Sequence, residues 1–256
     1  VKDADGNTLW TPGKLKHVKA IGWFIEEYGV TQVTMNITNI TETPLHLAFD
    51  ETAKAANARG IRATGSELVG LVPKSAMLEA GKYFLRKQNR STGIHESELI
   101  KIAIKSMGLD ELGPFIPEER IIEYMLESGT DKKLVDLSLT DFANETASES
   151  PAPGGGSISA YAGALGISLA TMVANLSAHK RGWDERWEEF SDWADKGQIL
   201  KDELLFLVDE DTNSFNKIME ALRLPKGTDA EKKARKEAER ILEAKSLALY
   251  EKNQSL

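Results

Sequence analysis

The chain has 256 residues, of which 41% are hydrophobic and 28% are charged, and its formal net charge is −8. This length suffices for one or two domains, each with a core of its own. The acidic balance disfavours general nucleic-acid binding, for which a basic surface is expected. The absence of cysteine excludes disulfides, zinc–thiolate sites and thiol catalysis. Without disulfides or a signal-like N-terminal stretch, we expect a cytoplasmic protein.

The first 127 residues show the pattern of a mixed α+β domain. Residues 17–27 and 30–37 are rich in β-forming side chains, and Tyr28-Gly29 between them is typical of a hairpin turn. A third β-like segment covers residues 61–72. Helices are predicted over residues 44–60, 74–88, 96–107 and 117–127. This order favours an α+β sandwich with helices on one face of a sheet.

The ends of the first predicted helix carry specific signals. Thr43 precedes Pro44 and is an N-cap candidate, because proline is favoured at the first helical position. Gly60 follows the last apolar residue of the pattern and suits a left-handed C-terminal cap.

The composition changes near residue 128, where SGTDKK is polar and rich in turn formers. We therefore place a linker over residues 128–136, between a domain over 1–127 and a second domain over 137–256. Beyond the linker no strand pattern is found. Helices are predicted over residues 137–149, 157–178, 184–224 and 228–253. The second domain is thus predicted to be all-α.

Residues 158–178 contain no charged side chain and are long enough to span a bilayer. Alanine and glycine predominate over leucine and isoleucine, and five serine, threonine and asparagine residues interrupt the apolar run. These features favour a helix buried on all sides in a bundle over a transmembrane helix. Small residues would let neighbouring helices, including one from another subunit, approach closely; they are Ala160, Gly163, Ala164, Gly166 and Ala170.

The stretch PAPGGGS, residues 151–157, precedes this apolar helix directly. A domain linker does not fit this context, and a phosphate-binding P-loop would need a lysine where Ser157 stands. A dinucleotide-binding loop would need a preceding strand. What remains is a tight turn into a helix, with Ser157 as N-cap candidate. The glycines serve either to let crowded helices pack or to expose backbone N–H groups to an anionic ligand, and the loop alone leaves both readings open.

An aspartate lies on the apolar face of the next long helix. Asp211 follows Leu207 by four residues and precedes Phe215 by four, whereas Asp209 is offset from this stripe. A carboxylate on an apolar face costs stability unless it is paired or functional. Asp211 is therefore either a general acid or base, or a structural group bound to a backbone amide or an arginine. The four histidines lack metal-ligand spacing, so we predict no metal site.

Several motifs in order along the chain resemble the formiminotransferase-cyclodeaminase family, which comprises bifunctional folate enzymes of histidine degradation. These motifs are AIGWFIEEYG, QVTMNITN, GSELVGLVP, PFIPEERIIEY, PAPGGGS and LVDEDTNSF. Residues 1–127 resemble the C-terminal subdomain of the transferase half, for which the family implies a ferredoxin-like sandwich. Residues after about 132 resemble the first two thirds of the cyclodeaminase half. The chain starts without methionine and stops after a helical pattern, so we expect a fragment that is incomplete at its C-terminus and lacks the N-terminal subdomain.

The resemblance implies two reactions. A formimino group passes from N-formiminoglutamate to N5 of tetrahydrofolate, and the product then closes to 5,10-methenyltetrahydrofolate with release of ammonia. Tetrahydrofolate is the implied co-substrate, without a metal. The family's motifs imply that Gly154, Gly155, Gly156 and Ser157 bind substrate and that Asp211 is catalytic, with Asp209 as second choice. The family's transferase histidine belongs to an N-terminal subdomain, so no transferase catalytic residue is assigned in this chain.

The resemblance also implies a homo-oligomer, a dimer or a larger ring. From the acidic charge and the composition of residues 158–178 we expect neither a nucleic acid nor a membrane as partner. Two other readings remain open. One is a stand-alone methenyltetrahydrofolate cyclohydrolase or cyclodeaminase. The other is a non-catalytic fragment that binds folate or serves assembly.

Overall fold

The computed structural model describes residues 5, 13–127, 133–225, 227–228, 231–237 and 240–241. The chain divides into two compact units. The first unit comprises residues 1–88 and 96–128, and the second comprises residues 89–95 and 129–256. The described parts of each unit have a hydrophobic core of their own.

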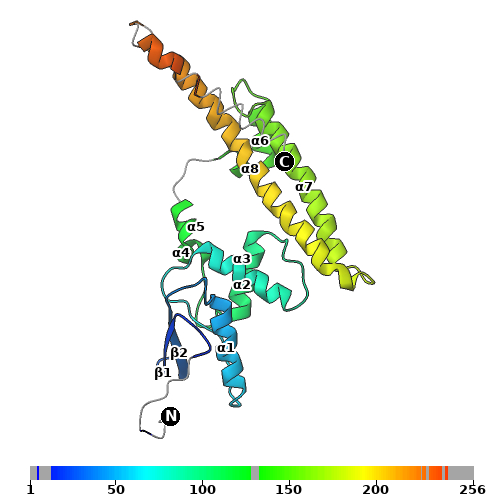
Figure 1. Ribbon diagram of the computed structural model, residues 1–256. Helices are drawn as coiled ribbons and strands as arrows, with labels where there is room; N and C mark the ends of the chain where they lie inside the picture. The colour runs from blue at the N-terminus through cyan, green and yellow to red at the C-terminus, as the bar shows by residue number, and fades with distance from the viewer. Residues whose placement is uncertain are drawn as a thin grey trace. The chain divides into compact units, whose positions relative to one another are not determined.

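The first unit contains an antiparallel hairpin of strands β1 (Val18–Ile25) and β2 (Val30–Ile37) (Figure 1). Val18 pairs with Ile37 and Ile25 with Val30, so the register runs along the whole length of both strands. The alternating pattern of the sequence predicted both strands, and this prediction is confirmed within two residues at each end.

The helices of the first unit pack around one apolar cluster, whose fully buried members include Met77, Ala80 and Ile121. The helices are α1 (Leu45–Asn57), α2 (Lys74–Arg86), α3 (Glu96–Met107), α4 (Pro117–Arg120) and α5 (Ile122–Glu127). The single helix predicted over residues 117–127 is therefore divided in two. The division falls at Ile121, which is extended and forms an isolated bridge with Val72.

The cap predictions for α1 are half correct. Gly60 adopts a positive φ of 74° just beyond the helix, as a left-handed C-terminal residue should. The predicted N-cap at Thr43 is wrong, because Pro44 occupies that position. The Thr43 hydroxyl instead donates a hydrogen bond of 2.7 Å to the carbonyl oxygen of Lys16, so this side chain ties α1 to the segment before β1.

The predicted third strand over residues 61–72 is wrong, because apart from the bridge at Val72 this segment forms no strand. Its backbone donors are engaged elsewhere. The Ser66 N–H donates to the carbonyl oxygen of Gly108 at the end of α3, and the Val72 N–H donates to that of Arg120. The described sheet therefore has two strands. The first unit contains both helices and strands, as expected, but the ferredoxin-like sandwich is not confirmed.

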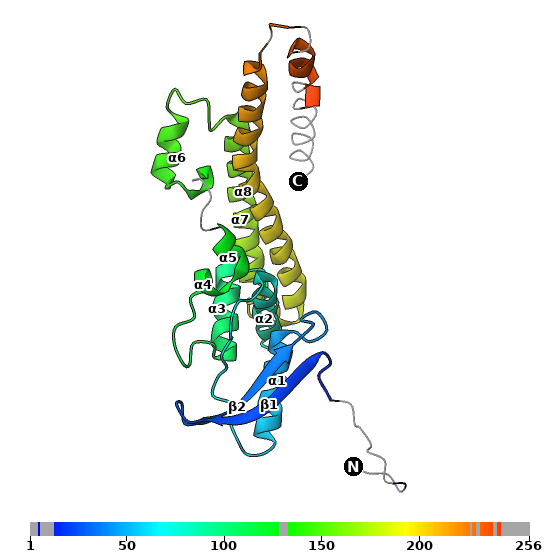
Figure 2. The same ribbon diagram turned by 90° about the vertical axis from the view of Figure 1, so that its left-hand side faces the viewer.

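In the second unit, two long helices lie side by side and antiparallel (Figures 1 and 2). Its elements are the 3₁₀ turn η1 (Leu134–Asp136), α6 (Leu139–Thr146), α7 (Gly155–Ala178), the 3₁₀ turn η2 (Asp184–Arg186) and α8 (Trp187–Arg223). The all-α prediction is confirmed for the described residues beyond 133. Of the helix predicted over 228–253, residues 231–237 are helical and most of the rest lies outside the described residues.

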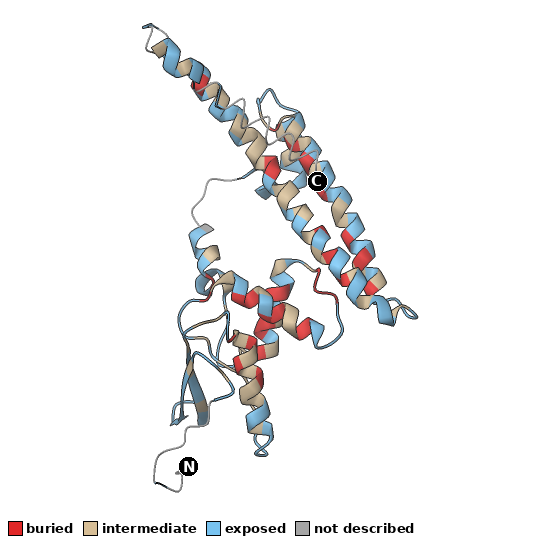
Figure 3. Cartoon of the chain, in the orientation of Figure 1, coloured by how far each residue is buried: buried red, intermediate tan, exposed pale blue. Residues whose placement is uncertain are grey.

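Helix α7 is buried along one face, not on all sides as expected (Figure 3). Its buried positions face α8, where Thr171 lies so close to Gly197 that a Cβ there would come within 2.0 Å of the threonine hydroxyl. Leu165, Leu169 and Leu176 on the other side are 51%, 62% and 66% exposed. By length and composition α7 would also qualify as a membrane span, and 28% of that span is buried in the described structure.

Candidate active site

The glycine-rich turn leads into α7 through Gly154, which is the N-cap in an extended conformation (φ −89°, ψ −175°). Ser157 lies in the first helical turn, so the prediction that it is the N-cap is wrong. No side chain of the turn itself caps the helix. A carboxylate of α8 does so instead: Asp211 Oδ2 accepts a hydrogen bond of 3.0 Å from the Ser157 N–H. The N-terminus of α7 is therefore capped by a tertiary contact, from a residue 54 positions further along the chain.

The side chain of Ser157 is fully buried between the two long helices. Its hydroxyl donates to the carbonyl oxygen of Val208 at 2.7 Å. It also lies 3.2 Å from Asp211 Oδ2 and 3.3 Å from the hydroxyl of Thr212. Ser157 thus holds Asp211 in place through both its backbone and its side chain.

The three glycines differ in what they contact. A Cβ at Gly156 would lie 2.3 Å from Asp211 Oδ1 and 2.6 Å from its Cγ, whereas a Cβ at Gly155 would have no neighbour within 4 Å. A Cβ at Gly154 would be in ordinary contact with Asp211 Oδ2, at 3.7 Å. Gly156 is therefore needed for the close approach of the carboxylate, and Gly155 lies open. Close packing explains Gly156, whereas the binding of a ligand at the open Gly155 stays a prediction.

The two carboxylate oxygens of Asp211 differ in their surroundings. Its Oδ2 is bound to a backbone amide, as a structural aspartate would be. Its Oδ1 lies against the bare Cα of Gly156 and accepts no hydrogen bond from any residue that the structure describes. One oxygen is therefore held at the positive end of the α7 dipole, and the other has no hydrogen-bond partner among the described residues.

Asp209 faces a different element. Its Oδ1 accepts a hydrogen bond of 2.6 Å from the Leu134 N–H, which fixes the turn η1 against α8. Beside this contact, Phe142 and Tyr161 meet at a tilted angle with their ring centroids 5.3 Å apart. Both rings border a cavity of about 20 Å³ that Val208 also lines. The structure therefore brings Asp211, and not Asp209, to the glycine turn. The apolar cavity lies on the side of Leu134, the partner of Asp209.

Within the described ranges, no group of three histidine, cysteine, aspartate or glutamate side chains could hold a metal ion.

One buried polar cluster in the first unit was not predicted from the sequence. Asp50 on α1 is 7% exposed and accepts hydrogen bonds from the hydroxyl of Tyr83 and from Lys87 Nζ, the latter at 2.7 Å. Burial raises the pKa of Tyr83 to about 12, and the bond to Asp50 acts in the same direction. The imidazole of His46 stacks on Tyr83, with centroids 4.3 Å apart. The spacing of four residues between His46 and Asp50, and between Tyr83 and Lys87, was the available signal.

A second cluster, in the second unit, involves residues 89–95. Thr92 is 2% exposed, and its N–H donates to the hydroxyl of Ser191 at 2.9 Å. The Gly93 carbonyl oxygen accepts hydrogen bonds from Asn175 at 2.7 Å and from Gln198 at 3.1 Å. These contacts fasten the segment to α7 and α8. Nothing in the periodicity of RSTG predicts them.

Comparison with known proteins adds to this geometry. The family model described as "Formiminotransferase domain" matches residues 2–127, and the one described as "Formiminotransferase-cyclodeaminase" matches residues 138–248. The formimidoyltransferase-cyclodeaminases of Gallus gallus and Mus musculus are 40% and 38% identical over 225 residues. These matches cover 88% of this chain and 41% of each relative, so the chain spans less than half of their length. A methenyltetrahydrofolate cyclohydrolase of Methylorubrum extorquens is 36% identical over 107 residues, 42% of this chain and 50% of the relative.

The two family models follow one another along the chain in the order of the motifs noted in the sequence. The second match contains both the glycine turn and Asp211, which the structure joins by a hydrogen bond. The chain therefore belongs to the formiminotransferase-cyclodeaminase family.

Proposed function

We propose that this chain forms part of a bifunctional folate enzyme of histidine degradation, and that the glycine turn and Asp211 belong to its cyclodeaminase site. The observation that carries the proposal is the bond between Asp211 and the first turn of α7, which leaves one carboxylate oxygen without a partner among the described residues. The relatives are named formimidoyltransferase-cyclodeaminases, and the reaction that the family resemblance implies is ring closure of 5-formiminotetrahydrofolate with release of ammonia.

The chemistry needs one proton to change place. N10 of the folate attacks the amidinium carbon on N5, and a tetrahedral carbon bearing both ring nitrogens and an amino group results. The proton on N10 must then reach the amino group, so that ammonia leaves and the methenyl cation remains. In our proposal Asp211 Oδ1 takes the proton from N10 and gives it to the departing nitrogen. Oδ2 stays bound to the Ser157 N–H throughout and keeps the carboxylate oriented.

The turn would contribute to binding through its backbone. Gly155 and Gly156 are the first two residues of α7, and the N–H groups at such a position have no acceptor within their own helix. No acceptor for either group is found among the residues the structure describes. Together with the helix dipole they favour an electron-rich part of the substrate, such as a carboxylate or the pterin carbonyl oxygen. The side chain of Ser157 would act indirectly, because it is buried against α8.

The remaining assignments extend this proposal to the rest of the protein. Residues 1–127 would be the C-terminal subdomain of the transferase, with a ferredoxin-like sandwich. Residues 128–136 would be a linker, and residues 137–256 the cyclodeaminase part. The transferase would use a catalytic group outside this chain. We further propose a cytoplasmic homo-oligomer without a metal and without a nucleic-acid or membrane partner. The exposed leucines of α7 support an oligomer, because such faces are usually covered.

A stand-alone cyclohydrolase is the second candidate, and the similarity to the Methylorubrum extorquens protein over 107 residues favours it. It would hydrolyse methenyltetrahydrofolate at the same site, with water in place of ammonia. The transferase-like residues 2–127 argue against this reading as a complete description. A non-catalytic chain that binds folate or serves assembly is the third.

Ammonia release from 5-formiminotetrahydrofolate distinguishes these candidates. It should be measured on this chain and on any longer protein that contains it, for the wild type, Asp211→Asn and Asp209→Asn. We expect Asp211→Asn to lower the rate by about 100-fold or more, since a general acid–base group contributes about 10² to 10⁴. Asp202→Asn, at an exposed position of the same helix, is the matched control. Full activity of Asp211→Asn would refute the role of Asp211, and loss in Asp209→Asn alone would transfer that role to Asp209.

A further inference from the structure

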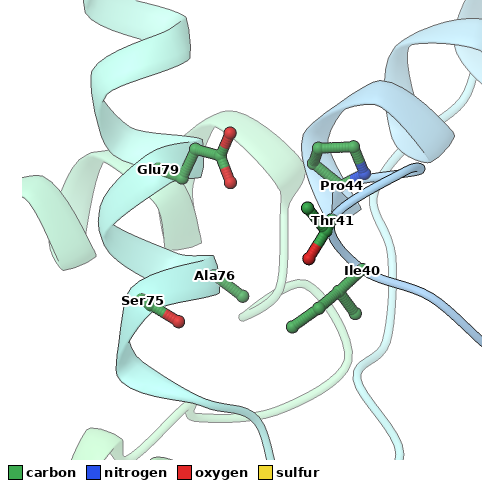
Figure 4. A pocket seen from close by; sticks show the side chains of 6 residues that line it. All are labelled: Ile40, Thr41, Pro44, Ser75, Ala76 and Glu79. Carbon is green, nitrogen blue, oxygen red and sulfur yellow. The ribbon is translucent and has the colours of Figure 1, made fainter.

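Solvent exposure separates two groups of polar side chains in this protein. A pocket of about 130 Å³ in the first unit is lined by Thr41, Ser75 and Glu79 among others (Figure 4). These three side chains are exposed, so water satisfies their polar groups. The hydroxyl of Ser157 is different, because this residue is 0% exposed. Its hydrogen bonds are therefore limited to the protein atoms around it.

The Ser157 hydroxyl carries one proton and faces two acceptors. The carbonyl oxygen of Val208 lies 2.7 Å from Oγ, and Asp211 Oδ2 lies 3.2 Å from it. A hydroxyl donates one hydrogen bond and rotates to suit its surroundings, so it serves one of these acceptors at a time. Each acceptor also has a second donor: the Thr212 N–H for the helical carbonyl of Val208, and the Ser157 N–H for Oδ2. Rotation of the hydroxyl therefore leaves neither acceptor without a hydrogen bond.

The hydroxyl of Thr212, which follows Asp211 on α8, lies 3.3 Å from that of Ser157. Three other threonines within helices donate to the carbonyl oxygen four residues earlier, at 2.7 to 2.8 Å; they are Thr52, Thr146 and Thr171. For Thr212 that carbonyl belongs to Val208, to which Ser157 donates. Because the proton of Ser157 points to one of its own two acceptors, Thr212 is the donor to the serine oxygen.

We propose that Thr212 is a further positioning residue of the cyclodeaminase site and acts on Asp211 through the Ser157 hydroxyl. The inference rests on the proposed function, in which Oδ1 takes the proton from N10 and then gives it to the departing nitrogen. While Asp211 is ionised, its charged Oδ2 is the stronger acceptor and attracts the Ser157 proton. Once Oδ1 carries the N10 proton the carboxyl is neutral, and the Ser157 proton turns to the Val208 carbonyl oxygen. The protons of Ser157 and Thr212 stay on their own oxygens throughout, so the balance of the reaction is unchanged.

This arrangement affects the catalytic step rather than substrate binding. A hydroxyl that rotates supports Asp211 in both charge states, whereas a fixed donor would favour one of them. Burial keeps the Ser157 side chain away from the substrate, and Thr212 acts through it. Loss of either hydroxyl should therefore lower kcat and leave KM unchanged.

Ammonia release from 5-formiminotetrahydrofolate, measured on this chain and on any longer protein that contains it, tests the role of Thr212. Thr212→Val keeps the shape of the side chain and removes its hydroxyl, so we expect kcat to fall by about five-fold with KM unchanged. Thr212→Ser retains the hydroxyl and should stay within about two-fold of the wild type. Thr146→Val is the matched control, because it removes the hydroxyl of an exposed helical threonine on α6.

A double variant tests whether Thr212 acts through Ser157. Ser157→Ala alone should lower kcat by about ten-fold, and the addition of Thr212→Val should lower it no further, because the two groups act as a unit. Urea unfolding of the wild type, both single variants and the double variant gives a readout that does not depend on activity. Contact between the hydroxyls predicts that the double variant loses less stability than the sum of the two single losses.

Three results would overturn the inference: equal kcat in Thr212→Val and Thr146→Val, a rise in KM instead of a fall in kcat, or additive effects of the two substitutions on kcat and on stability. If Ser157→Ala does not fold, Thr212→Val and Thr212→Ser decide alone, and equal kcat in these two variants would refute the role of the hydroxyl. If Asp211→Asn loses activity but Thr212→Val does not, this inference fails and the proposed function stands. If the wild type releases no ammonia, or Asp211→Asn keeps full activity, the proposed function fails and this inference fails with it.

Discussion

The contact between Gly156 and Asp211 leads to the sharpest prediction. In Gly156→Ala, the new methyl group would lie 2.3 Å from Asp211 Oδ1, whereas carbon and oxygen atoms normally stay at least about 3.5 Å apart. The carboxylate must therefore retreat by about 1 Å. Gly155→Ala adds the same methyl group one residue earlier, where nothing lies within 4 Å. The two variants differ only in whether the carboxylate is displaced.

The magnitudes follow from this geometry. Retreat of Asp211 weakens the tertiary cap on the Ser157 N–H, and loss of an N-cap costs about 1 kcal/mol. Crowding between α7 and α8 adds about 1–3 kcal/mol. Replacement of a helical glycine by alanine gains about 0.5–1 kcal/mol in both variants and cancels in the comparison. We expect Gly156→Ala to unfold more easily than Gly155→Ala by roughly 2 kcal/mol. The rate of ammonia release should fall by about 100-fold, since a shift of 1 Å costs that much.

Thermal unfolding and ammonia release, both measured on the two variants and the wild type, check the reasoning. For a chain of this size, 2 kcal/mol corresponds to a difference in Tm of roughly 4–8 °C. If Gly156→Ala matched Gly155→Ala in both measurements, the carboxylate would not lie against Gly156 and the site geometry would be refuted. Lower stability with full activity would leave Asp211 as a structural cap.

Three further predictions follow from single contacts. Asp211→Ala should destabilise the chain by about 1 kcal/mol in urea unfolding through loss of the cap, whereas Asp211→Asn keeps an acceptor and should stay near the wild type; equal losses would contradict a capping role. Because burial lowers the pKa of His46, the unfolded chain binds the proton first as the pH falls, so the first unit should lose stability below about pH 6.5. His46→Phe keeps a ring against Tyr83 and should reduce the change in the free energy of unfolding between about pH 8 and pH 5. The same pH dependence in wild type and variant would assign the effect to another group. A Cβ at Gly93 would lie 2.3 Å from that of Ala194, so Gly93→Ala should release residues 89–95 and raise their amide hydrogen exchange by about 100-fold or more, and unchanged protection would show that the segment is not fastened there.

Local patterns were sufficient wherever one element settles its own structure. The alternation of QVTMNIT and the turn at Gly29 predicted both strands of the hairpin, because side chains in a strand alternate between its faces. Helix α3 matches its predicted range at both ends. The predictions failed where backbone groups form hydrogen bonds with residues far along the chain. Residues 61–72 have strand-like composition, but Ser66 and Val72 bond to the ends of other segments.

At the candidate site, the sequence by itself determined the local features of the glycine turn and of the helix that carries Asp211. The spacing from Leu207 to Phe215 placed Asp211 on the apolar face of its helix, and the three glycines marked a turn that backbone or ligand can approach closely. The motifs pointed to the family. All of these features are local, because helical periodicity and glycine content are properties of a short stretch of chain.

Only the tertiary structure decided which of these pieces meet. The register between α7 and α8 depends on close contacts along the pair, such as that of Thr171 with Gly197. That register brings Asp211 to the Ser157 N–H and moves the cap of α7 from its own turn to a carboxylate 54 residues away. It also turns Asp209 toward η1. A one-residue shift of either helix would rotate its face by about 100°, so local periodicity leaves the partner of each carboxylate undetermined and packing selects it.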